Sequence, residues 1–479
     1  MFRFVLHISG ITLILIFIET IFLYFSSCQY SDLLESRGFS TGLSPEFMAA
    51  IITMTTIVGM TSVGMYNRKY FFHLDETISR AIVILPLVLG ALVLLFALRD
   101  YALDGPIHTS IYALCAATIA TFAPTLIILR KICLDILDRS DGIKPKILVI
   151  GTGSRAISLR NLSRELRHRS FTISGYALLT SQNAASEQRP WSNQENAATT
   201  DDLGQIISID SKELLDYCKK SDICEIVVAT TERRGMPVRD LLECKIKGVA
   251  TTDFGTFWER ESGQISLEDM SPSWLLFSDG FKLDKGRILI QRMFDILISS
   301  ILLLVTLPIT LLTAILIKLE SKGPIFYTQE RVGLHGKTFH VVKFRSMRTD
   351  AEKDGPRWAS KNDTRVTRVG AFIRKVRIDE IPQVINVLKG DMAFVGPRPE
   401  RPVFVSVLSE QIPYYNIRHA AKPGITGWAQ INYPYGATIE DAKMKLAFDL
   451  YYVKNGNFFL DILTMLQTVK VLLWNDGAH

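Results

Sequence analysis

The chain has 479 residues, of which 48% are hydrophobic and 21% charged, and its formal net charge is +6. Long apolar runs fill residues 1–130, whereas residues 131–280 have the mixed composition of a soluble segment. These features exclude a purely soluble, a disordered or a fibrous protein. The mild basic excess fits a surface near anionic lipid, or an anionic substrate, better than a nucleic-acid binder.

Cysteine and histidine spacing supports neither a disulfide framework nor a metal centre. None of the six cysteines forms a Cys-x-x-Cys pair, and the eight histidines are scattered along the chain. A metal bound by histidine or cysteine is therefore not expected.

Four apolar runs predict a transmembrane unit of four helices. Each run has about 18–22 residues, enough to cross a hydrocarbon core of about 30 Å. The first run lacks a small-residue cleavage site and three more runs follow it, so we interpret it as a retained helix rather than a signal peptide. The predicted spans are Val5–Phe25, Phe47–Met65, Ala81–Leu98 and Thr109–Leu129.

Basic residues orient these spans. Loop 66–80 and the segment after the fourth span carry most of the Lys and Arg residues, which favours the cytoplasmic side for both. The two ends of the unit are therefore expected in the cytoplasm. Inside the first span, we interpret Glu19 as an interhelical hydrogen-bonding or interface residue rather than as a proton relay.

The middle segment resembles a dinucleotide-binding fold without its cofactor signals. An apolar strand, residues 144–150, precedes Gly151-Thr152-Gly153 and a stretch with helical character. Ala156 occupies the third glycine position, and no acidic residue ends the second strand, so tight NAD binding is not expected. Nucleotide binding is the alternative to a structural or regulatory role. Further strands are predicted at Ser174–Leu179, Gln205–Ile209 and Ile223–Ala229, and a surface loop at 181–203.

A fifth apolar run, Ile296–Ile317, is long enough to span a membrane. Basic residues flank it on both sides, which favours both ends in the cytoplasm. Pro308 in its middle favours a helix–break–helix hairpin that enters one leaflet. We therefore predict a re-entrant helix over residues 293–318 instead of a fifth crossing.

Cations then gather around one acidic pair, Asp379 and Glu380. Arginine holds phosphate oxygens through paired hydrogen bonds, so this composition indicates a site for a polyanion such as a nucleotide diphosphate. The alternative for any one of these cations is that it belongs to a solvated basic face near lipid and does not bind substrate. The cations are Lys343, Arg345, Arg365, Arg368, Arg374, Lys375, Arg377, Arg398 and Arg401, and among them we select Lys343, Arg345, Arg374, Arg377 and Arg398 as substrate-binding candidates.

The acidic pair is expected at the N-terminus of a helix, because Pro382 and a helical apolar pattern follow it. Free N–H groups and the helix dipole favour phosphate there. Adjacent helical residues point about 100° apart, so one carboxylate can attack phosphorus while the other holds a divalent cation. The alternative is an N-cap role for Asp379, with Glu380 in the first turn.

The C-terminal block from about Gly286 resembles the bacterial sugar transferase family, the polyprenyl-phosphate hexose-1-phosphate transferases. The resemblance rests on KFRSM (343–347), RKVRIDEIPQ (374–383), KGDMAFVGPRP (389–399) and KPGITGWAQI (422–431), with DLYY (449–452) and Leu460-Asp461 beyond. The preceding spans and Rossmann-like segment also resemble the N-terminal extension of large, exopolysaccharide-associated members.

This resemblance implies a phosphoglycosyl transferase of the bacterial inner membrane, with its catalytic domain on the cytoplasmic face. The expected substrates are a UDP-hexose and undecaprenyl phosphate, and UMP is the expected product. Asp379 matches the family's nucleophile and Glu380 its Mg²⁺-binding residue. Lys343, Arg345 and Arg374 match cations around the diphosphate, and Arg398 lies in the Pro-Arg-Pro element beside the site.

The expected architecture is a membrane α plus α/β protein with a monotopic, α-rich (α+β) catalytic domain. The predicted divisions are a four-helix transmembrane unit at 1–135, a Rossmann-like domain at 136–265, a linker at 266–285 and the catalytic domain at 286–479. Membrane lipid is an expected partner and nucleic acid is not.

Two other functions are considered. A membrane nucleotide-sugar dehydratase would need an intact glycine fingerprint and a Tyr-x-x-x-Lys pair, and none of the 15 tyrosines has Lys four residues later. A non-catalytic scaffold for polysaccharide assembly would not require the acidic pair among phosphate-binding cations. The sequence leaves open the hexose, with glucose and galactose favoured, the ligand of the middle domain, and the oligomeric state, a homo-oligomer being one alternative. It also leaves open whether the apolar stretch 458–474 contacts the membrane or the domain core.

Overall fold

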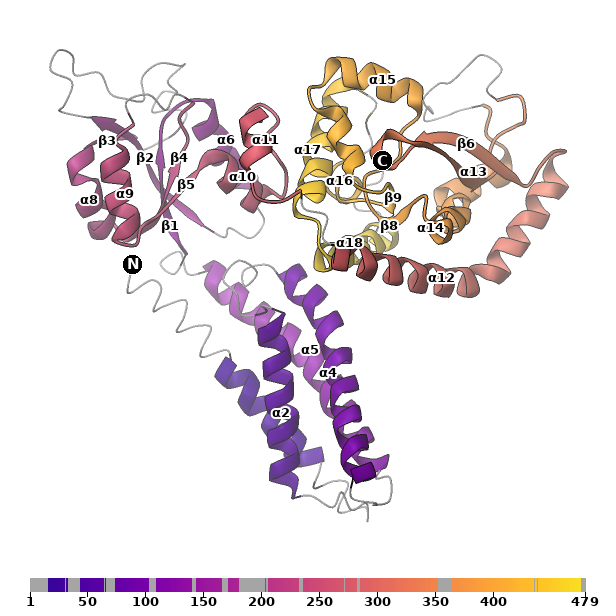
Figure 1. The fold of residues 1–479 in the computed structure, drawn as a ribbon, viewed down its shortest axis with the longest axis horizontal. Helices are drawn as coiled ribbons and strands as arrows, with labels where there is room; N and C mark the ends of the chain where they lie inside the picture. Colours follow the sequence, from indigo (N-terminus) through magenta and orange to yellow (C-terminus); the bar gives the residue numbers. More distant parts are fainter. Residues whose placement is uncertain are drawn as a thin grey trace. The chain divides into compact units, whose positions relative to one another are not determined.

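The fold is described from a computed structural model. The described chain separates into two compact units, Met1–Ser262 and Gly263–His479, and each is treated by itself (Figure 1). The described residues are 16–30, 32, 44–63, 65, 74–102, 109–139, 144–165, 171–180, 203, 206–231, 236–270, 272–281, 285–351, 364–434, 436 and 438–474. The predicted surface loop at 181–203, apart from its last residue, lies outside them, as do the start of the first predicted span and the basic residues of 66–73.

The N-terminal part of the first unit consists of apolar helices. Residues 16–30 are helical, and α2 (Pro45–Ser62), α4 (Leu74–Ala102) and α5 (Thr109–Arg139) follow. Within α4 and α5, the segments Thr77–Ala97 and Ala113–Ile132 are long and apolar enough to cross a membrane, whereas the apolar part of α2 is shorter. Helices form at the second, third and fourth predicted spans, and the four-span arrangement stays a prediction.

These helices pack through apolar side chains and one buried ion pair. α4 contacts both α2 and α5, and the shared core includes Leu23, Met48, Leu92 and Leu114. Glu19 is fully buried, and its Oε1 accepts a hydrogen bond from Nε of Arg130 at 3.2 Å. The prediction that Glu19 forms an interhelical hydrogen bond is confirmed, because Arg130 belongs to α5.

The rest of the first unit is a five-stranded parallel sheet in the order β3-β2-β1-β4-β5. Its strands are β1 (Lys146–Ile150), β2 (Thr172–Thr180), β3 (Ile206–Asp210), β4 (Ile223–Val228) and β5 (Ala250–Asp253). The predicted Rossmann-like strands are confirmed. The prediction missed β5 because its four residues, Ala-Thr-Thr-Asp, lack an apolar pattern.

Helices cover both faces of this sheet (Figure 1). Side chains of α8 (Leu214–Lys220) and α9 (Val238–Ile246) join one core cluster, and those of α6 (Ser154–Glu165) and α10 (Phe254–Ser262) join the other. β1 is buried on both faces, which explains its uninterrupted apolar sequence.

The predicted glycine turn lies between β1 and α6. Gly151 has a φ of +116°, and a Cβ at this position would contact the side chain of Thr230. Glycine is therefore required here by the backbone and by the close approach of β4's C-terminal end. This requirement accounts for the turn without any bound nucleotide.

The second unit combines helices with two small sheets. β6 (Phe326–Val332) and β7 (Thr338–Phe344) form an antiparallel hairpin, and β8 (Ala393–Val395) pairs in parallel with β9 (Gly424–Thr426). The helices are α11 (Pro272–Phe277), α12 (Lys285–Glu320), α13 (Arg368–Lys375), α14 (Val384–Lys389), α15 (Pro402–Gln411), α16 (Trp428–Asn432), α17 (Ile439–Asn455) and α18 (Phe458–Trp474), with short 3₁₀ helices η2 (Leu334–Gly336), η3 (Ile378–Gln383) and η4 (Tyr415–Ala420).

Part of the segment predicted as a linker belongs to the core of this unit. Ile265 and Met270 are buried in one cluster with Leu446 and Leu450 of α17. The backbone N–H of Ile265 donates to the carbonyl of Ala447 at 3.0 Å. Residues 265–270 are therefore packed, in contrast to the expected linker at 266–285.

α12 contains the fifth apolar run and differs from the predicted hairpin. It is one continuous helix of 36 residues with Pro308 inside, longer than the predicted 293–318. Figure 1 shows that it bends along its length, as expected when proline removes one backbone hydrogen bond without ending the helix. Most of its apolar side chains are exposed, among them Leu297, Leu304, Leu311 and Leu312.

Both ends of α12 are held by the second unit. Near its start, Arg292 donates to the carbonyls of Val387 and Leu388 at 2.6 Å, and Asp295 accepts from the N–H of Phe394 at 2.9 Å. Beyond its end, Arg345 donates to the carbonyl of Lys322 at 3.1 Å. The exposed apolar middle thus lies between two anchored ends.

The first half of α18 packs on the domain core. Leu460 and Leu463 are buried in a cluster with Val395 and Tyr452, whereas Val469 near the other end is 53% exposed. Of the two alternatives left open by the sequence, core packing is observed for this half. Contact with a membrane stays a prediction for the remainder.

Candidate active site

A β-hairpin and a short helical segment build the centre of the site. The side chain of Asn386 in α14 holds the two together: its Oδ1 accepts from the N–H of Val342 at 3.0 Å, and its Nδ2 donates to the carbonyl of His340 at 2.7 Å. This clamp aligns β7, which carries Lys343, with η3, which carries the acidic pair. Sequence inspection did not indicate this role, because Asn386 and β7 are more than 40 residues apart.

The acidic pair forms the second and third residues of the 3₁₀ segment η3, which leads directly into α14. Arg377 precedes it with a φ of +60°, a backbone conformation that residues other than glycine adopt only occasionally. The predicted position at the start of a helical segment is observed, although the first six residues are 3₁₀ rather than α. Neither carboxylate acts as a side-chain N-cap, since the N-cap position is occupied by Arg377 without a capping hydrogen bond.

Glu380 is paired with two cations. Nζ of Lys343 lies 2.7 Å from its Oε1, and Nη2 of Arg398 lies 3.5 Å from the same oxygen. Burial opposes ionisation of Glu380, but the positive charges of Lys343 and Arg398 outweigh it and lower its pKa to about 2. Glu380 is therefore ionised throughout the neutral range.

The pKa of Asp379 is shifted in the opposite direction. Its side chain is buried, with an exposed fraction of 8%. Burial and the adjacent negative charge of Glu380 raise its pKa, against the opposing charges of Lys343 and Arg374. Two neighbouring carboxylates in one site thus have pKa values moved in opposite directions, a pattern typical of functional sites.

The predicted substrate-binding cations fall into two groups. Lys343, Arg374 and Arg398 line the same cavity as Asp379, with Arg374 coming from α13. Arg345 also lines that cavity, but its guanidinium donates to carbonyls beyond the end of α12. Arg377 lies outside the residues that line the cavity. Phosphate binding by each of these residues stays a prediction.

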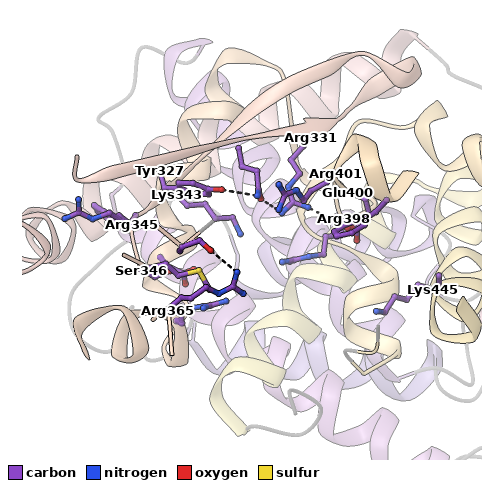
Figure 2. A pocket seen from close by; sticks show the side chains of 18 of the residues that line it. Tyr327, Arg331, Lys343, Arg345, Ser346, Arg365, Arg398, Glu400, Arg401 and Lys445 are labelled. Atoms are coloured by element: carbon purple, nitrogen blue, oxygen red, sulfur yellow. Dashed lines mark hydrogen bonds and ion pairs between the residues drawn. The ribbon is translucent and has the colours of Figure 1, made fainter. Parts of the chain in front are cut away.

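The cavity has a volume of about 580 Å³, within the range of small-molecule sites. Ten of its lining residues are Arg or Lys and three are Asp or Glu, so it suits an anionic ligand. Figure 2 shows the labelled cations around the cavity, where they come from several elements and the guanidinium of Arg345 points away from the others. The cationic lining residues are Arg331, Lys343, Arg345, Arg348, Arg365, Arg374, Arg398, Arg401, Arg418 and Lys445.

Sequence reasoning missed one buried ion pair that supports this cavity. Arg418 of η4 donates to Oδ2 of Asp449 at 2.7 and 3.0 Å, to the hydroxyl of Tyr415 at 2.9 Å and to the backbone carbonyl of Arg398 at 2.9 Å. It therefore fixes the backbone that presents Arg398 to Glu380. Asp449 belongs to the DLYY segment noted in the sequence, which was the available signal.

The carboxylates can be tested for their fit to Mg²⁺. Mg²⁺ is usually bound by one or two carboxylates together with water and substrate phosphates. Among the described residues, no group of three or more His, Cys, Asp or Glu side chains is close enough to hold a metal ion. Asp379 and Glu380 supply the oxygen ligands that this chemistry requires, so the donor set fits a cation whose coordination is completed by a phosphate substrate.

Comparison with known proteins places the site in a wider group. Residues 286–475 match the family model of the bacterial sugar transferases. The UDP-N-acetylgalactosamine-undecaprenyl-phosphate N-acetylgalactosaminephosphotransferase of Aeromonas hydrophila is 47% identical over 190 residues, which are 40% of this chain and 45% of that protein.

Two further relatives extend over more of the chain. The undecaprenyl-phosphate glucose phosphotransferase of Komagataeibacter xylinus is 32% identical over 342 residues, which are 70% of this chain and 60% of that protein. The UDP-glucose:undecaprenyl-phosphate glucose-1-phosphate transferase of Caulobacter vibrioides is 35% identical over 268 residues, which are 52% of this chain and 100% of that protein. The chain thus covers about half of the first two relatives and the whole of the third.

Proposed function

Because the chain belongs to the bacterial sugar transferase family, we propose that it transfers a hexose 1-phosphate from a UDP-sugar to undecaprenyl phosphate and releases UMP. This would be the first membrane step in the synthesis of an exopolysaccharide repeat unit. The observation that carries the proposal is the buried carboxylate of Asp379 in a cavity lined by ten cations. The relatives' names mention glucose and N-acetylgalactosamine, so these sugars and galactose are the donors to test.

In the first step, a carboxylate oxygen of Asp379 attacks the phosphorus that carries the sugar. A new bond forms between this oxygen and phosphorus, and the bond from phosphorus to the bridging oxygen breaks, so that UMP leaves with that oxygen. Burial leaves little water around the attacking carboxylate. Arg374 and Arg398 line the cavity, where they would bind the phosphate oxygens and stabilise the charge on the leaving group.

In the second step, a phosphate oxygen of undecaprenyl phosphate attacks the same phosphorus. The bond to Asp379 breaks, which restores the carboxylate and yields an undecaprenyl diphosphate sugar. Splitting the transfer in this way lets a soluble donor and a lipid acceptor use one nucleophile in turn.

Glu380 has a different role in this mechanism, because Lys343 and Arg398 keep it ionised and oriented. We assign to Glu380 the binding of Mg²⁺. When bound, this cation would neutralise charge on the phosphate oxygens. Lys343 would hold the Glu380 carboxylate in place before the substrate arrives.

The same proposal includes a location. Within the described residues, three helices are long and apolar enough to cross a membrane, which together with the family indicates a membrane protein. We propose that it is a multi-pass protein of the bacterial inner membrane with the catalytic unit in the cytoplasm. α12 would enter one leaflet and return, which is supported by its bend, its exposed apolar middle and its two anchored ends.

The covalent intermediate gives the decisive test. The purified protein would be mixed with a UDP-sugar in the absence of lipid acceptor and examined by peptide mass spectrometry. We expect a hexose-phosphate adduct on the peptide that contains Asp379, and no adduct in Asp379→Asn. We also expect that variant to lose at least about 10³-fold in turnover, since the covalent route is closed rather than weakened.

Two results would contradict this assignment. One is robust turnover by Asp379→Asn. The other is an adduct on a different residue. A matched control is Asp279→Asn, which makes the same chemical change at an exposed position outside the cavity lining and should leave both the adduct and turnover intact.

A further inference from the structure

α18 carries a buried polar face that the proposed mechanism does not use. Asp461, Thr464 and Thr468 follow one another at intervals of three and four residues, which places them on one side of the helix. Asp461 is 3% exposed and Thr464 is fully buried. α18 contacts both strands of the small parallel sheet, β8 and β9 (Figure 1). This face therefore lies in the protein interior, where polar groups need hydrogen-bond partners.

Two hydrogen-bonded links join this face to the two strands. The hydroxyl oxygens of Thr468 and Thr426 are 2.6 Å apart, which connects α18 to β9. Asp461 reaches β8 through the hydroxyl of Tyr452 in α17. The hydroxyl oxygen lies 2.7 Å from Oδ1 of Asp461 and 3.0 Å from the carbonyl oxygen of Val395. Tyr452 therefore stands between α18 and β8.

The two contacts of the Tyr452 hydroxyl need one proton more than the hydroxyl has. The carbonyl oxygen of Val395 only accepts hydrogen bonds, so the hydroxyl must donate to it. An ionised carboxylate also only accepts, so the contact with Asp461 then has a proton only if the carboxyl supplies it. If the hydroxyl donated to an ionised Asp461 instead, the oxygens of Tyr452 and Val395 would face each other at 3.0 Å without a proton between them. The amide of Gln291, 3.4 Å from the hydroxyl oxygen, donates to that oxygen and leaves this count unchanged.

The surroundings of Asp461 also favour a neutral carboxyl. Burial raises the pKa of Asp461 to about 7, and the negative charge of Asp295 in α12 acts in the same direction. The hydrogen bond with Tyr452 and the positive charge of Arg287 in α12 oppose this shift without cancelling it. β8, β9 and α16, which α18 also contacts, contain no titratable residue. Near neutral pH the carboxyl therefore retains a proton that an exposed aspartate has lost.

We propose that Asp461 is a positioning residue that works in its protonated form: it donates to the hydroxyl of Tyr452, which donates to the carbonyl of Val395 and so holds β8 in place. β8 matters to the site because Val395 precedes Arg398 by three residues, and Nη2 of Arg398 lies 3.5 Å from Oε1 of Glu380. The effect on catalysis rests on the proposed function. The proton on Asp461 does not, and it can be measured by itself.

The proton is detected by infrared spectroscopy of the full chain in a detergent that contains no carbonyl group. A protonated carboxyl has a C=O stretching band that an ionised carboxylate lacks. At pH 6 we expect this band to be stronger in the wild type than in Asp461→Asn, and the difference to disappear at pH 9. Asp279→Asn makes the same change at an exposed position of the same unit, and at pH 6 its spectrum should match that of the wild type in this region.

The effect on the site is measured as kcat/KM for UMP release between pH 6 and 9. When Asp461 loses its proton, the hydroxyl of Tyr452 turns to the carboxylate and the carbonyl of Val395 loses its donor, so wild-type kcat/KM should fall as the pH rises. Asp461→Asn keeps an amide N–H donor at every pH, so we expect it to stay within about threefold of the wild type at pH 6 and to fall less by pH 9. Tyr452→Phe removes the link and should lower kcat/KM about tenfold, mainly by raising the KM for the UDP-sugar.

The possible failures differ from one another. If the wild type releases no UMP from any UDP-sugar, the proposed function fails, while the infrared comparison still decides whether Asp461 is protonated. Equal bands in the wild type and Asp461→Asn at pH 6 would show that Asp461 is ionised and would overturn the proposal. So would full activity of Tyr452→Phe, or an Asp461→Asn variant whose activity falls with pH as in the wild type. Failure of Asp461→Asn to fold would also contradict it, because a neutral donor of the same shape should replace the protonated carboxyl.

Discussion

At the scale of single residues, the site contains two neighbouring carboxylates whose pKa values are shifted in opposite directions. One carboxylate oxygen of Glu380 pairs with both Lys343 and Arg398, and these two positive charges stabilise its negative charge. Asp379 is buried next to that charge, and burial together with Glu380 raises its pKa against the opposing charges of Lys343 and Arg374, so its charge is less stabilised. The pair therefore combines a strongly stabilised anion with a less stabilised one, as the proposed roles of cation ligand and nucleophile require.

This electrostatic balance predicts how activity responds to pH. Asp379 must be ionised to attack, so kcat/KM should fall as the pH drops through its raised pKa. Glu380→Gln removes the negative charge that raises this pKa, and we expect the acid limb of the profile to move to lower pH. Arg374→Ala removes a positive charge that lowers the pKa, and we expect the limb to move to higher pH.

The measurement is kcat/KM for UMP release between pH 4 and 8 at saturating Mg²⁺. The quantity compared is the pH at the midpoint of the acid limb, not the maximum value of kcat/KM. Both variants will also lose activity, so the midpoint is the informative quantity. Midpoints that move in the same direction for both variants would contradict the assignment of this limb to Asp379.

At the scale of elements, α12 is fixed at its end by Arg345. The guanidinium donates to the carbonyls of Ser321 and Lys322 and to the hydroxyl of Ser321. Gly323 makes this possible: its φ is +131°, and a Cβ there would collide with the guanidinium. The KFRSM segment therefore joins the end of α12 to the wall of the cavity.

A lysine substitution separates two roles of Arg345. Arg345→Lys keeps the charge but cannot donate to several carbonyls at once, because an ammonium lacks the planar fork of guanidinium. If Arg345 mainly caps α12, we expect the thermal unfolding midpoint in detergent to fall by about 5–10 °C, since unsatisfied buried partners cost about 1–3 kcal/mol each. Unchanged stability with a raised KM for the UDP-sugar would instead indicate phosphate binding.

The topology of α12 is a second prediction at this scale. Both ends of the helix contact the same unit, so we expect reporters fused after Lys322 and at the C-terminus to lie in the cytoplasm. A fifth crossing would place Asp379 on the side away from its nucleotide substrate. Alkaline phosphatase and green fluorescent protein fusions at both positions would measure this, and an external signal from either would refute the re-entrant arrangement.

At the scale of the whole molecule, the division into two units predicts which fragments function. Gly263–His479 contains the acidic pair, the cavity and α12. We expect a protein of residues 263–479, solubilised with lipid, to retain measurable transferase activity. Complete loss in a folded, membrane-bound fragment would show that the first unit contributes directly to the reaction.

A shorter fragment should be less stable. Starting at residue 281 would remove Ile265 and Met270 from their cluster, and the hydrogen bond from Trp428 Nε1 to the carbonyl of Gly263 at 2.8 Å. Each buried apolar side chain contributes about 1.5–3 kcal/mol, so we expect a clearly lower unfolding midpoint for 281–479 than for 263–479. Equal midpoints would show that residues 263–280 are dispensable for the fold.

The sequence by itself determined the features that depend on neighbouring residues. Long apolar runs identified α4, α5 and α12, and a short uninterrupted apolar run identified β1. Pro382 after the acidic pair identified the start of a helical segment. Short motifs were sufficient to relate residues 286–475 to the bacterial sugar transferases. Local patterns carry this information because helix and strand periodicity, proline geometry and motif chemistry all act within a few residues.

Only the tertiary structure decided which distant residues meet. Arg418 reaches Asp449 and the carbonyl of Arg398, Asn386 clamps β7, and Lys445 enters the same cavity as Asp379. It also showed α12 to be continuous through Pro308, because the remaining backbone hydrogen bonds hold the helix together when proline removes one. Such contacts join residues far apart along the chain, and they follow from how whole elements pack, which local sequence patterns do not encode.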